Sequence, residues 1–169
     1  MSAGREDPDL LATVARHGAG LVLMHMLGDP RTMQVAPRYG DVLEEVAAFL
    51  LARTEAARAA GIAHDRIWID PGLGFGKSFA HNEALLIGLE RLVGLGLPVM
   101  VGASRKGFLG GITGRAVGDR LAASLACVAR AFEAGAHAVR VHDVAPTADL
   151  LRTLDRISPH RPPPSPPAL

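Results

Sequence analysis

Short apolar runs alternate along the chain with longer stretches in which apolar residues recur at helical spacing. The apolar runs have the length of strands and cover residues 20–26, 66–70, 98–104 and 137–143. The amphipathic stretches have the length of helices and cover residues 7–17, 41–60, 82–93, 118–134 and 147–157. Strands that alternate with helices in this way are typical of βα units that share a parallel sheet. The pattern therefore predicts one α/β domain over residues 1–157, with four strands and about five helices.

Polar residues gather where the predicted strands end. Asp70 closes the second strand, residues 104–106 (Ser-Arg-Lys) follow the third, and Arg140 and His142 lie in the fourth. In α/β folds, ligands bind beyond the carboxyl ends of the strands. Because strand residues alternate between two faces, Arg140 and His142 are expected to project side by side. A guanidinium beside an imidazole predicts a site for an anion.

The stretch DPGLGFGKS, residues 70–78, has the composition of a phosphate-binding loop but not its spacing. The P-loop pattern would require glycine at Pro71, and the dinucleotide fingerprint would require glycine at Lys77. The three glycines instead predict a backbone that adopts positive φ and approaches a ligand closely. We therefore expect a ligand-facing turn with Asp70 at its start, and no nucleotide site.

Lysine is rare in this chain. Only Lys77 and Lys106 are lysines among the 18 basic residues, and both lie in loops that follow predicted strands. An ammonium is a compact point charge, whereas a guanidinium is planar and forked, so the two are not interchangeable. The bias toward arginine elsewhere indicates that these two positions, Lys106 above all, require a point charge.

Other polar residues have structural interpretations. We expect His25 to finish the first strand near the core, and His81 and Asn82 to cap the helix after the glycine loop. The charged residues between positions 115 and 120 are interpreted as a solvated turn.

Composition excludes several classes of partner. The formal net charge is +1 and aromatic residues make up 4% of the chain, which argues against nucleic acid and against an anionic membrane surface. The single cysteine, Cys127, allows no disulfide within the chain, and its apolar surroundings predict buried packing in a helix. No apolar run approaches the roughly 20 residues of a membrane span, and the start lacks a signal-peptide core. We expect a soluble, cytoplasmic protein with a disordered, proline-rich tail over residues 158–169.

Four segments occur in a fixed order along the chain, and they read LMHMLGDPRTMQ, IWIDPGLGFGKSFAHN, PVMVGASRKGFLG and AVRVHDV. Together they resemble the dihydropteroate synthase family, and the resemblance covers residues 2–157. It implies a (β/α)₈ TIM barrel, of which this chain holds the C-terminal half. It also implies a transferase of folate biosynthesis and a target of sulfonamides. Members join 4-aminobenzoate to (7,8-dihydropterin-6-yl)methyl diphosphate and release diphosphate.

The same resemblance implies the residues that bind the two flat rings. Asp70 is similar to the carboxylate that pairs with the amino-pyrimidine edge of the pterin. Met24 resembles a residue that packs on the pterin ring, and Gly102 resembles the position that lets the pterin approach the strand. Lys106 is similar to the lysine that spans the pterin and aminobenzoate regions, and Phe75 to the apolar wall beside the aminobenzoate.

Arg140 and His142 resemble the diphosphate-binding pair of the family, and with Lys106 they form the implied catalytic set. The resemblance implies Mg²⁺ bound with the substrate diphosphate, with its protein contact upstream of Met1 and no metal ligand in this chain. The implied partners are the two small-molecule substrates. A second copy of the chain is also expected, because the apolar helix face over residues 121–132 favours a homodimer.

A complete barrel requires eight βα units, whereas the pattern predicts four. Three explanations stay open: a truncated gene, a half-barrel that assembles with another copy or another chain, and a non-catalytic relative. We expect weak or absent turnover for this chain alone. A pterin-binding methyltransferase domain would share the Asp70 carboxylate but would have little use for the diphosphate pair. A metallohydrolase using His25, Asp70 and His142 would lack the compact His spacing of known metal sites.

Overall fold

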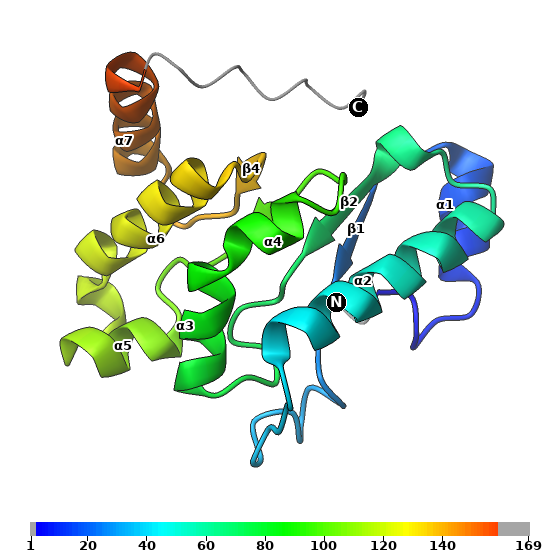
Figure 1. The fold of residues 1–169 in the computed structure, drawn as a ribbon, viewed down its shortest axis with the longest axis horizontal. Helices are drawn as coiled ribbons and strands as arrows, with labels where there is room; N and C mark the ends of the chain where they lie inside the picture. The colour runs from blue at the N-terminus through cyan, green and yellow to red at the C-terminus, as the bar shows by residue number, and fades with distance from the viewer. Residues whose placement is uncertain (1–2, 159–169) are drawn as a thin grey trace.

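The computed structural model describes residues 3–158, and all four of its strands run parallel (Figure 1). They are β1 (Leu21–Met24), β2 (Ile67–Asp70), β3 (Met100–Val101) and β4 (Ala138–Val139). β1 pairs with β2, β3 pairs with β4, and a parallel bridge between Ile69 and Val99 joins the two pairs. The strand order therefore follows the chain, which confirms the predicted parallel α/β arrangement. The proline-rich tail lies, from residue 159 onward, outside the described residues.

Within residues 3–158, seven α-helices connect or follow the strands. They are α1 (Leu10–His17), α2 (Val42–Ala59), α3 (Phe79–Ile87), α4 (Leu89–Val93), α5 (Gly107–Thr113), α6 (Leu121–Ala134) and α7 (Val144–Ile157). Helix α2 packs against β1 and β2, and α6 packs against α7. No helix in this part of the chain combines the length and the apolar character needed to cross a bilayer.

The expectation of about five helices was wrong for two reasons. The stretch 82–93 is divided at Gly88, where a Cβ would lie 2.4 Å from Leu43 Cδ2 of α2. A side chain there would displace Leu43, and glycine favours a break in the helix. Helix α5 was not predicted because three of its seven residues are glycine; it ends at Gly114, whose φ is 68°.

The expected strands 98–104 and 137–143 are also much shorter than predicted, because the ladder between β3 and β4 covers only two residues on each. The chain turns away soon afterwards at Arg105, a non-glycine residue with φ 57°. The residues that follow this two-residue ladder therefore form loops at the carboxyl ends of the strands.

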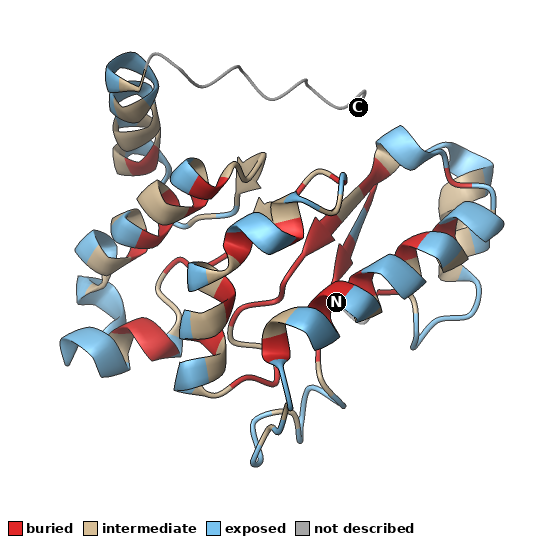
Figure 2. Ribbon diagram, in the orientation of Figure 1, coloured by how far each residue is buried: buried red, intermediate tan, exposed pale blue. Residues whose placement is uncertain are grey.

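The two faces of the sheet differ. One face packs against helices and forms the core (Figure 2), and its fully buried residues include Leu23, Ile67, Ile69 and Val99. Met24 is paired with Asp70, and Val101 is paired with Val139. Because neighbours along a strand alternate, the residues on the opposite face include Met24, Asp70, Gly102 and Arg140. Four residues singled out from the sequence therefore share one face, near the carboxyl ends of the strands.

Candidate active site

The glycine loop that follows β2 is pressed against the loop that follows β1. A Cβ on Gly72 would lie 1.8 Å from the carbonyl oxygen of His25, and a Cβ on Gly76 would lie 2.6 Å from Cβ of Leu27. Gly72, Gly74 and Gly76 all have positive φ, between 65° and 78°. Both the close approach and the left-handed backbone exclude larger residues. The glycines therefore fix the shape of the loop that begins at Asp70.

The far end of the same loop is tied to α3. Ser78 caps this helix by accepting the backbone N–H of His81, whose Nδ1 in turn accepts the N–H of Ser78. The buried Asn82 accepts the N–H of Gly74 through Oδ1, at 2.6 Å. The expected helix cap is confirmed for His81, while Asn82 mainly holds the loop, which makes the loop a rigid element.

Asp70 ends β2 with its carboxyl group buried, at 4% exposure, and Oδ1 accepts the N–H of Gly72 at 2.7 Å. Burial raises the pKa of Asp70, since a charged carboxylate is poorly solvated there. The Gly72 N–H, Lys106, Arg140 and Lys77 act in the opposite direction and lower that pKa. Asp70 is thus a buried hydrogen-bond acceptor whose charged form is favoured by three basic side chains.

Lys106 extends back from the start of α5 to the glycine loop. Its Nζ donates to the carbonyl oxygen of Leu73 and lies 4.5 Å from the centre of the Phe75 ring. A cation over an aromatic face is attracted by the ring quadrupole. Burial lowers the pKa of Lys106 to about 8, an effect that Asp70 opposes and Arg140 reinforces. A basic amine and an aromatic ring therefore share one position beside Asp70.

The other lysine, Lys77, lies behind the glycine loop. It is 4% exposed, its Nζ lies 2.9 Å from Nδ1 of His25, and it donates to the Phe75 carbonyl at 3.1 Å. Burial lowers the pKa of Lys77 to about 7 and that of His25 to about 3. A charged Lys77 can only donate, so a neutral His25 accepts this hydrogen bond through Nδ1, and both groups support the loop from inside. The expected position of His25 near the core is confirmed.

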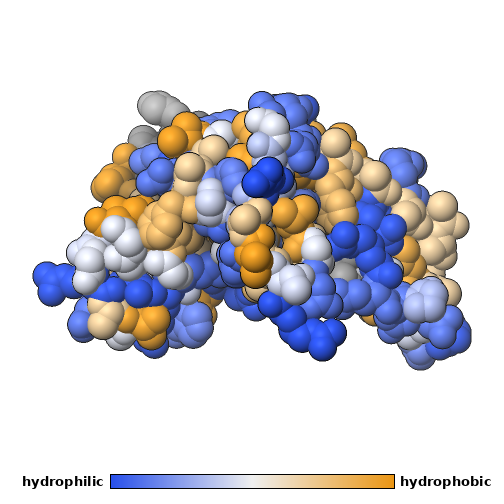
Figure 3. Space-filling view, turned by 90° about the horizontal axis from the view of Figure 1, so that it is seen from below, coloured by the Kyte–Doolittle hydropathy of each residue, from blue (hydrophilic) through white to orange (hydrophobic). Residues whose placement is uncertain are grey.

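Beyond β3 and β4, basic side chains line a cavity of about 290 Å³. Its walls are formed by Gly102, Ser104, Lys106, Arg140, Val141 and His142. Arg140 and His142 are exposed while Val139 and Val141 are half-buried, as expected from strand alternation. Figure 3 views the molecule from the end toward which β1 and β2 run, and shows hydrophilic and hydrophobic residues intermixed over that face. The cavity can accept an anionic group.

All seven residues expected to bind substrate therefore lie in one region. Lys106, Arg140 and His142 share the cavity, and Asp70 lies close enough to Lys106 and Arg140 for their charges to affect its pKa. The remaining three lie beside them: Met24 is paired with Asp70, the Phe75 ring faces Lys106, and Gly102 faces the Arg140 side chain.

Two contributors were missed by the sequence analysis. Gln34, the last residue of the segment LMHMLGDPRTMQ, was assigned no role, yet it donates through Nε2 to the carbonyl oxygen of Gly74. Arg120 was wrongly interpreted as part of a solvated turn: it donates to the carbonyl oxygens of Arg105 and Lys106, at 3.1 and 3.3 Å. A residue 15 positions away in sequence thus holds the loop that carries Lys106.

The metallohydrolase alternative would need His25, Asp70 and His142 to act together as metal ligands. Over residues 3–158, no group of three or more His, Cys, Asp or Glu side chains lies close enough together to hold a metal ion. His25 is engaged by Lys77 and His142 by Ser104. The described residues thus offer no ligand set for the metallohydrolase alternative.

Comparisons with known proteins agree with this arrangement. The model of a family described as pterin binding enzyme matches residues 1–142. Dihydropteroate synthase of Escherichia coli (strain K12) is 41% identical over 149 residues, which cover 88% of this chain and 53% of that protein. The dihydropteroate synthase of Neisseria meningitidis serogroup B is 45% identical over 164 residues, which cover 92% of this chain and 56% of that protein.

Solved structures give the same result. The crystal structure of dihydropteroate synthase from Stenotrophomonas maltophilia with active site-bound imidazole matches with a TM-score of 0.90 at 44% identity, over 95% of this chain and 61% of that one. The Xanthomonas albilineans enzyme in complex with 7,8-dihydropteroate matches with a TM-score of 0.86 at 44% identity, over 95% and 58%. The chain spans about half the length of the curated relatives it matches, and its parallel βα units form the corresponding part of a TIM barrel. The chain belongs to the pterin-binding enzyme family.

Proposed function

We propose that this chain forms the pterin- and diphosphate-binding part of a dihydropteroate synthase. Its substrates would be (7,8-dihydropterin-6-yl)methyl diphosphate and 4-aminobenzoate, and its products dihydropteroate and diphosphate. The observation that carries the proposal is the convergence of Asp70 with Lys106, Arg140 and His142 at the carboxyl ends of parallel strands. The names of the relatives and of their bound ligands support the same reaction.

The site offers a complementary group to each end of the pterin substrate. The buried Asp70 carboxylate accepts the N–H groups of the amino-pyrimidine edge, a pairing that a low-dielectric site strengthens. Met24 lies across from Asp70 and covers the ring. Arg140 and His142 take the diphosphate at the cavity, as expected for planar guanidinium and imidazole donors. Lys106 lies between these regions and faces the Phe75 ring, where the aminobenzoate would pack.

The reaction is a displacement at the methylene carbon of the pterin. The amine nitrogen of 4-aminobenzoate forms the new C–N bond, the C–O bond to diphosphate breaks, and the electron pair leaves with the diphosphate. The amine loses a proton to solvent. Negative charge grows on the leaving oxygen, and Arg140 and His142 already line the cavity that would hold it before the reaction begins. Such preorganised electrostatic stabilisation contributes about 3 kcal/mol per donor in comparable sites.

Magnesium would enter with the diphosphate. Mg²⁺ prefers oxygen ligands such as carboxylates, whereas the cavity side chains Lys106, Arg140 and His142 are nitrogen groups that suit the anion itself. The residues described here do not fit a Mg²⁺ site, so no step is assigned to the ion.

We further propose that the chain alone binds the pterin substrate but turns it over slowly, because it spans about half the length of its relatives. A homodimer through residues 121–132 is part of the proposal. In support, Leu121 at the start of α6 is 38% exposed, although Cys127 and Val128 of the same helix face the core of their own chain.

Isothermal titration calorimetry with the pterin diphosphate tests this function. We expect binding by the wild-type chain and a loss of about tenfold or more in affinity for Asp70→Asn, because the amide presents an N–H to ring donors. Glu44→Gln, which changes an exposed carboxylate on α2, is the matched control and should bind as the wild type does. If a pterin that lacks the diphosphate bound as tightly as the pterin diphosphate, the methyltransferase alternative would be favoured instead. Equal affinities for the Asp70 variant and its control would refute the proposal.

A further inference from the structure

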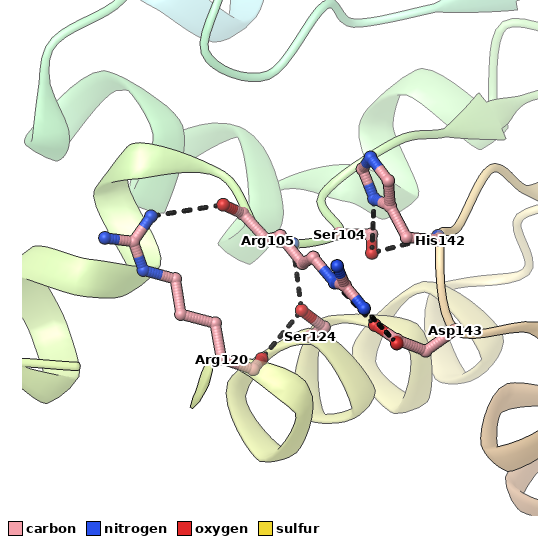
Figure 4. A network of polar contacts seen from close by, with 6 residues as sticks. All are labelled: Ser104, Arg105, Arg120, Ser124, His142 and Asp143. Carbon is pink, nitrogen blue, oxygen red and sulfur yellow. Dashed lines mark hydrogen bonds and ion pairs between the residues drawn. The ribbon is translucent and has the colours of Figure 1, made fainter. Parts of the chain in front are cut away.

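The loop that carries Lys106 touches the segment that carries Arg140 and His142 at two adjacent points (Figure 4). Ser104 Oγ accepts the backbone N–H of His142 at 3.2 Å, and it lies 3.0 Å from Nδ1 of the His142 ring. Next to this contact, Arg105 Nε donates to Oδ2 of Asp143 at 3.0 Å, and a second guanidinium nitrogen pairs with Oδ1. Two consecutive residues of one loop thus hold two consecutive residues of the other.

Helix α6 and the residue before it hold the loop that carries Lys106 in place. The N–H of Arg105 donates to Ser124 Oγ at 3.0 Å, and Arg120 donates to the Arg105 carbonyl oxygen. The left-handed backbone of Arg105, with φ 57°, directs its side chain toward Asp143 while Lys106 extends toward the glycine loop. Ser104 therefore presents its hydroxyl to His142 from a defined position.

A hydroxyl beside a ring nitrogen can determine which nitrogen of the imidazole carries a proton. A serine hydroxyl has one proton and two lone pairs. Oγ already accepts the backbone N–H of His142, and Ser104 is only 7% exposed. Its proton can be donated to Nδ1, and a buried hydroxyl gains by making that bond. Nδ1 is then an acceptor, and a neutral imidazole must carry its proton on Nε2.

Nε2 lies on the side of the ring away from Ser104 (Figure 4), and His142 lines the cavity together with Arg140. With the proton on Nε2, the ring donates a hydrogen bond to an anion in the cavity. With the proton on Nδ1, the Nε2 lone pair would face the anion and repel it. We propose that Ser104 is a positioning residue that sets the orientation and the tautomer of His142, so that an N–H faces the leaving diphosphate. The role of the N–H rests on the proposed function, whereas the tautomer does not.

Nitrogen-15 NMR of the ligand-free chain tests the tautomer directly, at about pH 8.5 where a free imidazole is neutral. The ring signals of His142 are identified by their loss in His142→Gln. We expect the wild-type ring to be protonated on Nε2. In Ser104→Ala both nitrogen shifts should move toward the averaged values of free imidazole, and Ser104→Thr, which keeps a hydroxyl, should retain the wild-type pattern.

Ser78→Ala is the matched control, because Ser78 also contacts a histidine, His81, and neither residue lines the cavity. It should leave the His142 signals unchanged. A wild-type ring protonated on Nδ1, or a Ser104→Ala spectrum identical to that of the wild type, would overturn the proposal.

Calorimetry with inorganic diphosphate measures the consequence for binding. We expect Ser104→Ala to weaken the affinity for diphosphate about fivefold, which corresponds to the loss of one correctly oriented hydrogen bond. Ser104→Thr, which keeps the hydroxyl, should retain the wild-type affinity. If the wild-type chain bound no diphosphate, the proposed function would fail while the NMR result would still decide the role of Ser104. If the wild type bound diphosphate and Ser104→Ala bound it equally well, the positioning role would be refuted.

Discussion

Replacing Gly72 by alanine tests how tightly the glycine loop is pressed against the end of β1. The new Cβ would lie 1.8 Å from the carbonyl oxygen of His25, on a backbone with φ 66°. The left-handed backbone alone costs an alanine about 1–2 kcal/mol, partly offset by the lower entropy of the unfolded chain. The steric overlap adds about 1–3 kcal/mol as overpacking. It also strains the hydrogen bond between the His25 N–H and the Asp70 carbonyl oxygen, a buried bond whose loss costs about 1–3 kcal/mol.

Gly28→Ala is the matched control, because Gly28 has φ 65° and no atom within 4 Å of the position of a Cβ. It should cost about 1 kcal/mol, whereas Gly72→Ala should cost about 2–6 kcal/mol more. Trp68 is the only tryptophan of the chain and lies in β2, two residues before the loop. Urea unfolding followed by its fluorescence therefore reports on both variants. Equal free energies of unfolding for the two variants would refute the argument from close approach.

Three further predictions follow from the buried titratable groups. Burial lowers the pKa of Lys77 from 10.5 in the unfolded chain to about 7 in the folded one. Between these two pH values Lys77 is protonated in the unfolded chain and largely neutral in the folded one. Its contribution to the free energy of unfolding therefore rises with pH. Lys77→Met should reduce the rise measured by urea unfolding across this pH range, leaving the part that Lys106 contributes through its own lowered pKa, and an unchanged slope would contradict the prediction. Lys106→Arg should weaken pterin binding by about tenfold or more in calorimetry, because a larger, forked guanidinium does not fit the place where the compact ammonium donates to the Leu73 carbonyl oxygen; wild-type affinity would show that no point charge is needed. Burial raises the pKa of Cys127 to about 11, so iodoacetamide should label the native thiol at least about a hundredfold more slowly than the urea-unfolded one, as measured by mass spectrometry; equal rates would contradict its burial.

The sequence predicted those parts of the site that depend on local order. Strand alternation was sufficient to place Arg140 and His142 on one face, and parallel topology was sufficient to bring Asp70 and Lys106 to the same end of the sheet. The family resemblance added the roles of Met24, Phe75 and Gly102, which local chemistry alone does not indicate. These roles stay predictions, although the structure brings the residues together.

The features that escaped prediction depend on contacts between distant residues. The bond between Lys77 and His25 joins positions 52 residues apart, and no periodicity reveals that a loop lysine is buried. Arg120 has the local environment of a solvated turn, yet it donates to two carbonyl oxygens of the loop that carries Lys106. Helix α5 forms despite three glycines because Phe108 and Leu109 are buried in the core. Tertiary packing overrides low helix propensity there.

The central claim is that basic side chains at the ends of neighbouring strands form one anion site. Its most direct test is the affinity for inorganic diphosphate of Arg140→Gln, compared with Arg152→Gln, which changes an exposed arginine of α7 whose side chain is 78% exposed. We predict that the Arg140 variant loses about tenfold or more in affinity, and that the Arg152 variant stays within about twofold of the wild type. Equal affinities for the two variants, or no diphosphate binding by the wild-type chain, would contradict the account.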